Sequence, residues 1–166
     1  MNMKPCICGK SKPFAACCAP FLSGEKIAKT PEQLMRSRFS AYALGGYGEY
    51  LLSTWLPSCA HGLVASELSK PTVNWQGLHV ISSSQKGDNG VVEFKAWFSA
   101  SSRFDDLEVM HEVSEFIRIG SRWFYAGVKN NNSISAIAIL IFTRSMVTGA
   151  RRPIRLCQDM KSLAAF

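Results

Sequence analysis

The sequence predicts an α+β fold in which helices pack on one face of a curved antiparallel sheet. Two observations carry this prediction. A capped amphipathic helix follows Thr30, and from Asn74 onward the apolar pattern changes from helical to strand-like spacing. Helices followed by a run of strands are typical of α+β domains. With 166 residues and 47% hydrophobic content, the chain is long enough for one such domain with a small appendage.

The main helix is predicted from its start signal. Residues 30–33 read Thr-Pro-Glu-Gln, which supplies an N-cap hydroxyl, proline at the first helical position and an amide three residues after the cap. Gly45 and Gly46 end the helix. A second helix is expected over about residues 47–56, before Pro57. The apolar face of the first helix comprises Leu34, Met35, Phe39, Tyr42 and Ala43.

Four strands are predicted, and turn residues separate them. The sequence Gly-Asp-Asn-Gly at 87–90 and Gly-Ser at 120–121 are turn signals between consecutive apolar runs. Strands connected in this way form an antiparallel meander. The predicted strands span residues 77–84, 91–99, 107–119 and 123–128.

The charge distribution argues against a nucleic-acid-binding surface on the main domain. The net charge is +7, but residues 129–166 hold six basic residues and one acid, which leaves +2 for residues 1–128. Residues 1–12 contain no apolar run, and nothing reaches the roughly 20 apolar residues of a membrane span. We therefore expect a cytoplasmic protein without a membrane span.

The clearest chemical signal is a group of four cysteines. Cys6 and Cys8 are followed, after eight residues, by Cys17 and Cys18, which is close enough for one loop to surround a single ion. Four thiolates in a reducing compartment favour zinc, although iron is also accepted, with one metal ion per chain. A closed site of this kind leaves no open position for substrate, so its role should be structural. The alternative is that these cysteines are buried thiols or disulfides.

The cysteine segment resembles the SEC-C motif, a metal-binding knuckle named for the C-terminus of the secretion ATPase SecA. All four ligand positions are present, but Ile7 replaces the usual proline between the first cysteines, and Pro13 lies in the loop.

A second set of segments extends over about residues 4–127. These segments are Pro20-Phe21, Ser23-Gly24, residues 34–42 (Leu-Met-Arg-Ser-Arg-Phe-Ser-Ala-Tyr), residues 54–58 (Thr-Trp-Leu-Pro-Ser), residues 75–78 (Trp-Gln-Gly-Leu), residues 92–94 (Val-Glu-Phe), His111-Glu112 and residues 122–125 (Arg-Trp-Phe-Tyr). In order and spacing they resemble the YchJ family. This resemblance implies an N-terminal SEC-C motif followed by a nuclear transport factor 2-like domain, a cone of helices against a bent sheet.

The resemblance divides the chain into three parts. We expect a metal knuckle at residues 1–20, the nuclear transport factor 2-like domain at 21–128 and an atypical basic tail at 129–166. Family members often continue into a second knuckle, whereas this tail has only Cys157. A shifted reading frame or a divergent terminus would explain the tail.

A pocket between the helices and the sheet is typical of such a cone, and four polar residues are candidates to face it. Arg36 and Arg38 are two apart on one helix, so at most one points inward, and a structural ion pair is the favoured role. His111 and Glu112 are neighbours on a strand and point to opposite faces, so they cannot form one acid/base pair. If the face that holds Glu112 points inward, this carboxylate becomes the best polar anchor.

Three functions follow from these features. The favoured one is a non-enzymatic metal-binding protein whose knuckle contacts a macromolecular partner, which the SEC-C resemblance places in the translation or export machinery. The alternative is a small-molecule binder or enzyme that uses the cone pocket, although the sequence shows no set of nucleophile, base and orienting group. In the third, the knuckle is a staple that caps the main domain.

Overall fold

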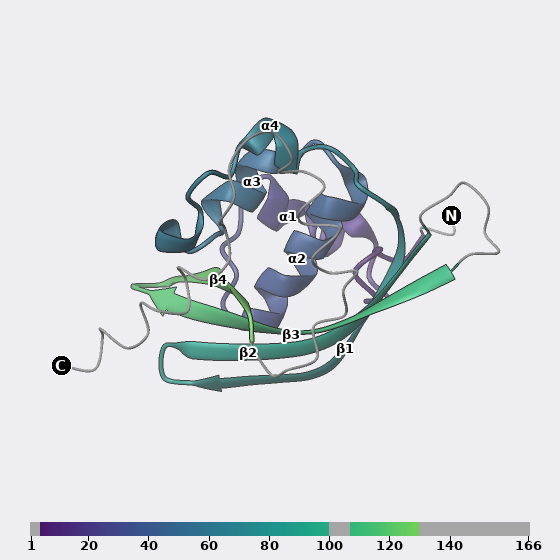
Figure 1. The fold of residues 1–166 in the computed structure, drawn as a ribbon. Coiled ribbons are helices and arrows are strands. Elements are labelled where there is room, and N and C mark those ends of the chain that lie inside the picture. The colour runs from purple at the N-terminus through teal and green to yellow at the C-terminus, as the bar shows by residue number, and fades with distance from the viewer. Residues whose placement is uncertain (1–3, 100–106, 130–166) are drawn as a thin grey trace.

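The computed structural model describes residues 4–99 and 107–129, and it has the expected order of helices before strands (Figure 1). A four-stranded sheet curves beneath a group of short helices, and the longest helix, α2, packs against the sheet. The elements are η1 (Phe14–Ala16), α1 (Ala19–Leu22), α2 (Pro31–Leu44), α3 (Gly48–Ser53), η2 (Pro57–Cys59), α4 (Ala65–Leu68), β1 (Asn74–Lys86), β2 (Asn89–Ser99), β3 (Leu107–Ile119) and β4 (Arg122–Val128).

The sheet is an antiparallel meander in the order β1-β2-β3-β4, as predicted. Two tight hairpins connect β1 to β2 and β3 to β4, and in each the first loop residue is a glycine with positive φ: 59° at Gly87 and 60° at Gly120. A residue with a side chain is strained in this conformation, which explains the glycine at both turns.

Helix α2 begins and ends at the predicted signals. The Thr30 side chain accepts a hydrogen bond from the Gln33 backbone N–H at 3.2 Å, and Gln33 Oε1 accepts one from the Lys29 N–H at 2.7 Å. These bonds satisfy backbone donors that the first turn leaves open. Gly45, with φ 70°, ends the helix.

The core lies between α2 and the inner face of the sheet. Helix α2 contributes Leu34, Met35 and Phe39, which are buried against apolar side chains that alternate along the strands. This arrangement confirms the predicted α+β class. The buried cluster on the sheet comprises Leu78, Val92, Phe94, Ala96, Phe98, Met110, Phe116, Trp123 and Tyr125.

The second predicted helix is shorter than expected, because its last residues pair with the sheet instead. The Tyr125 N–H donates to the Thr54 carbonyl oxygen and the Leu56 N–H donates to the Tyr125 carbonyl oxygen, both at 2.8 Å. A bridge between Trp55 and Tyr125 accompanies these bonds. Strand β4 thus pairs with backbone groups that a longer helix would have satisfied internally.

The basic tail and the expected lack of a membrane span remain to be compared with the structure. The predicted basic tail falls, from residue 130 onward, outside the described residues. Among the helices of the described ranges, none has both the length and the apolar character that a bilayer span requires.

Candidate metal centre

The first cysteine pair lies on a tight turn. The Gly9 N–H donates to the Cys6 carbonyl oxygen at 3.1 Å, and the Cys6 N–H donates to the Lys12 carbonyl oxygen at 2.8 Å. Gly9 has a φ of 84°, which lets the chain reverse immediately after Cys8. The turn therefore presents both thiols on the same side.

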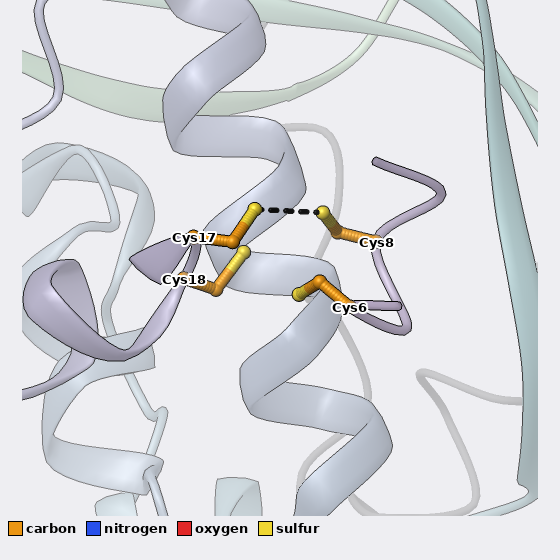
Figure 2. Close-up of side chains that lie close together, drawn as sticks. All are labelled: Cys6, Cys8, Cys17 and Cys18. Carbon is orange, nitrogen blue, oxygen red and sulfur yellow. Dashed lines mark hydrogen bonds between the residues drawn. The ribbon is translucent and has the colours of Figure 1, made fainter. Parts of the chain in front are cut away.

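The second pair is presented by a junction of two short helices. Cys17 follows η1, where its N–H donates to the Phe14 carbonyl oxygen at 3.0 Å, and Cys18 is the N-cap residue of α1. Figure 2 shows the side chains of both pairs pointing toward one another beside a helix. Phe14 and Leu22 pack around the thiols and complete a small cluster.

The four sulfur atoms lie close enough to surround one ion. All of them are within 4.8 Å of one another, and Cys8 Sγ is 3.6 Å from Cys17 Sγ. In a tetrahedral thiolate site with Zn–S bonds of about 2.3 Å, neighbouring sulfurs are about 3.8 Å apart. Cys6, Cys8 and Cys18 are buried and Cys17 is half-buried. The residues present thus fit a closed four-sulfur metal site.

The closely packed thiols shift one another's pKa values. Hydrogen bonds from the neighbouring thiols, that of Cys18 first, lower the pKa of Cys8 to about 5. Burial raises the pKa of Cys17 to about 12, and the hydrogen bond with Cys8 raises the pKa of Cys18 well above its usual range. Because metal ligation requires thiolates, binding of a cation here would have to release the protons of Cys17 and Cys18.

The cysteine cluster is fixed to helix α2, chiefly by Arg36. Its Nη1 donates to the Cys8 carbonyl oxygen at 2.5 Å, and its Nε pairs with Glu32 Oε1 at 2.7 Å. The Cys18 thiol lies 3.7 Å from the Arg36 carbonyl oxygen. Cys6 Sγ is 3.8 Å from Ser40 Oγ, one turn further along α2. Arg36 thus makes the ion pair expected from the sequence and contacts the turn that holds the first cysteine pair.

Arg38 points the opposite way and is 3% exposed. Its Nη1 donates to the Leu51 carbonyl oxygen at 2.8 Å and to Thr54 Oγ1 at 2.6 Å. The guanidinium carbon also lies 4.8 Å from the Tyr125 ring centroid and 5.2 Å from that of Trp55. These contacts hold α2, α3 and β4 together.

Glu112 lies on the inner face of β3 and is 6% exposed. Its Oε1 accepts hydrogen bonds from the Ser114 hydroxyl and, at 3.2 Å, from the Tyr125 hydroxyl. Burial raises the pKa of Glu112, and these hydrogen bonds and the Arg38 charge only partly oppose that shift. Burial also raises the pKa of Tyr125 well above its usual range. Arg38 and Glu112 are therefore linked through Tyr125.

His111 lies on the outer face of the same strand, where its Nε2 is 2.9 Å from Glu93 Oε1. The four candidate polar residues therefore occupy three places: Arg36 at the knuckle, Arg38 with Glu112 inside, and His111 outside. None of them lines the groove of about 330 Å³ between α1, α3 and the start of β4. Ligand binding by these four stays a prediction. No periodic pattern in the sequence indicates this groove, because loops supply much of its lining.

Known proteins combine a similar cysteine motif with a similar domain. The fold and site define a protein that joins a SEC-C-like cysteine motif to an NTF2-like domain. The protein-family model for the YchJ middle NTF2-like domain, described as YchJ_M-like, matches residues 30–127 of this chain. The chain belongs to the YchJ family, which confirms the resemblance seen in the sequence.

Curated relatives carry the name UPF0225 protein. SG1365 of Sodalis glossinidius is 38% identical over 129 residues, 73% of this chain and 80% of that protein. The protein plu2503 of Photorhabdus laumondii is 39% identical over 130 residues, 75% of this chain and 80% of its own. A relative in Deinococcus radiodurans is 39% identical over 123 residues, 74% of this chain and 86% of its own.

A solved structure shows the same architecture. The solution structure of RPA3114 from Rhodopseudomonas palustris, described as a SEC-C motif containing protein, matches with a TM-score of 0.68 and 31% sequence identity. The match covers 77% of this chain and 99% of RPA3114.

Proposed function

We propose that Cys6, Cys8, Cys17 and Cys18 bind one metal ion, with zinc preferred over iron, and that this centre serves a non-enzymatic interaction module. The observation that carries the proposal is the approach of four thiols to within 4.8 Å of one another. The SEC-C description of RPA3114 supports it. Thiolate ligands require a reducing compartment, so we place the protein in the cytoplasm.

The proposed partner is a macromolecule that contacts the knuckle, residues 1–20, alone or together with the domain at 21–128. By analogy with the SecA terminus, the translation or export machinery is the expected partner class. A closed site with four protein ligands leaves the metal no position for substrate. The metal would therefore shape a surface rather than catalyse a reaction.

Cobalt titration of the reduced apoprotein tests the ligand set. We expect saturation at one equivalent, with sulfur-to-metal charge-transfer bands and the visible absorption of a tetrahedral thiolate centre. Cys17→Ser should weaken both signals, while Ser58→Ala, which changes a hydroxyl away from the cluster, should preserve them. Equal spectra for the parent and Cys17→Ser would exclude Cys17 as a ligand.

A second candidate role is a fold staple, and the hydrogen bond from Arg36 to the Cys8 carbonyl oxygen favours it. Deletion of residues 1–20 separates the two roles. A staple predicts that the remainder no longer unfolds cooperatively, because α2 loses its cover. A docking module predicts a folded remainder that no longer contacts its partner. Heteronuclear NMR spectra of the truncated and full chains distinguish the two results.

A further inference from the structure

The groove between α1, α3 and the start of β4 adjoins both hydrophobic clusters of the molecule. Its volume is about 330 Å³. Among its lining residues, Phe21 packs against the main core and Leu22 packs against the cysteine cluster. Tyr50 supplies aromatic surface from α3, whereas Trp123 of β4 is only 3% exposed and contributes little to the lining. The shape of the groove therefore depends on how the knuckle sits on the domain.

Hydrogen bonds hold the groove walls in place. Trp123 Nε1 donates to the Lys29 carbonyl oxygen at 3.2 Å, which ties the loop before α2 to β4. The Lys26 N–H donates to the Pro20 carbonyl oxygen at 2.8 Å, and the Tyr50 hydroxyl lies 2.6 Å from Ser37 Oγ. A binding surface that is already ordered loses little conformational entropy when it is filled.

The charged residues of the groove are mainly basic. Lys26 and Arg122 are exposed and line the groove together with one acid, Glu49. Within the described ranges, neither Lys26 nor Arg122 takes part in a salt bridge. Cationic side chains beside an apolar cavity are complementary to carboxylates that flank an apolar group.

We propose that this groove binds a short acidic peptide segment of a partner protein, which packs one large apolar side chain against Phe21 and Tyr50. A volume near the lower end of the range of ligand pockets, roughly 300–1,000 Å³, suits one anchor side chain. Carboxylates on either side of the anchor pair with Lys26 and Arg122. The inference rests on the proposed docking function and names the chemistry of the docked segment.

NMR titration of the metal-loaded full chain with the acetylated peptide Asp-Glu-Phe-Asp-Glu tests this inference. Saturable shifts are expected at Leu22, Tyr50 and the Trp123 indole, and they should weaken as salt is added. Lys26→Glu combined with Arg122→Glu should lower the affinity about 5- to 30-fold, since it removes two exposed pairs of about 0.5–1 kcal/mol each. Lys86→Glu combined with Lys95→Glu makes the same charge change elsewhere and should preserve binding.

The inference would be overturned if no shifts appeared at the groove, or if the peptide Lys-Lys-Phe-Lys-Lys gave equal shifts. Equal binding of phenylacetate and the acidic peptide would also contradict it, because a small aromatic anion would then be the better description of the occupant. Metal content is measured on the same samples. If the chain contains metal but does not bind the peptide, only the groove inference is contradicted. If the chain contains no metal, the proposed metal centre is contradicted.

Discussion

Arg36 Nη1 donates a hydrogen bond to the carbonyl oxygen of Cys8 at 2.5 Å, although the two residues are 28 positions apart. The ion pair of Arg36 with Glu32 holds the guanidinium in position for this contact. One side chain of α2 therefore fixes the turn that presents the first cysteine pair. Ligands positioned by such outer contacts bind metal with less loss of conformational freedom.

Arg36→Ala should weaken both folding and metal binding. The change leaves the Cys8 carbonyl oxygen without this donor, which costs about 1–3 kcal/mol of the free energy of unfolding. Urea denaturation measures this loss, and competition with a zinc chelator measures the loss of affinity. Lys70→Ala, which removes an exposed ion pair with Glu67, should cost less than about 0.5 kcal/mol. Equal effects of the two variants would show that Arg36 does not support the knuckle.

Two glycines with similar backbone conformation form a matched test of knuckle packing. Gly9 has a φ of 84° and Gly24 has a φ of 79°. A Cβ at Gly9 would lie 2.1 Å from the Leu78 carbonyl oxygen on β1, whereas one at Gly24 would meet nothing within 4 Å. Both changes to alanine incur backbone strain of about 1–2 kcal/mol, and Gly9→Ala adds a clash.

We expect Gly9→Ala to destabilise the protein by at least about 2 kcal/mol more than Gly24→Ala does, because backbone on β1 cannot easily move. Thermal and urea denaturation of both variants give the comparison. If the two variants are equally stable, the knuckle does not pack against β1 as described.

Glu112 should make stability fall as pH rises. Its pKa is raised in the folded state, so from about pH 4.5 upward the folded protein keeps a proton that the unfolded chain has released. The contribution of Glu112 to stability is greatest below this range, declines up to the raised pKa and is then constant. Glu112→Gln removes this contribution, so the variant should gain stability relative to the parent between about pH 5 and about pH 8.

Urea denaturation at both pH values tests the Glu112 prediction. The cysteine thiols also bind protons, but they do so in both proteins. The difference in the free energy of unfolding between variant and parent therefore cancels their contribution. Glu108→Gln removes a less buried carboxylate of the same strand and should keep the pH dependence of the parent. A constant difference between Glu112→Gln and the parent across the range would contradict the account.

Local signals predicted most of the fold. The cap at Thr30 and the turn glycines at 87 and 120 act through their own neighbours, so the sequence was sufficient to place α2 and the hairpins. Strand β1 extends to Lys86, past the expected end, because its polar residues stay paired with β2 while exposed. The shortening of α3 depends on pairing between Trp55 and Tyr125, which no local pattern reveals.

The sequence predicted the cysteine cluster from spacing alone, but not what surrounds it. Helical geometry separated Arg36 from Arg38 without deciding which would be buried, because that depends on where the knuckle and α3 pack. Strand alternation placed His111 and Glu112 on opposite faces, and the structure has this arrangement. The groove beside Trp123 could not be predicted, because it is formed by residues far apart in the sequence. An example is the hydrogen bond from Trp123 to the Lys29 carbonyl oxygen, about a hundred positions away.

Elemental analysis of the purified, reduced protein tests the central claim most directly. The account predicts about one zinc or iron ion per chain in the parent, and loss of that metal in the Cys17→Ser/Cys18→Ser double variant. Retained secondary structure in the variant, seen by circular dichroism, would separate ligand loss from global unfolding. A parent protein without metal, or a double variant with unchanged metal content, would contradict the four-cysteine centre.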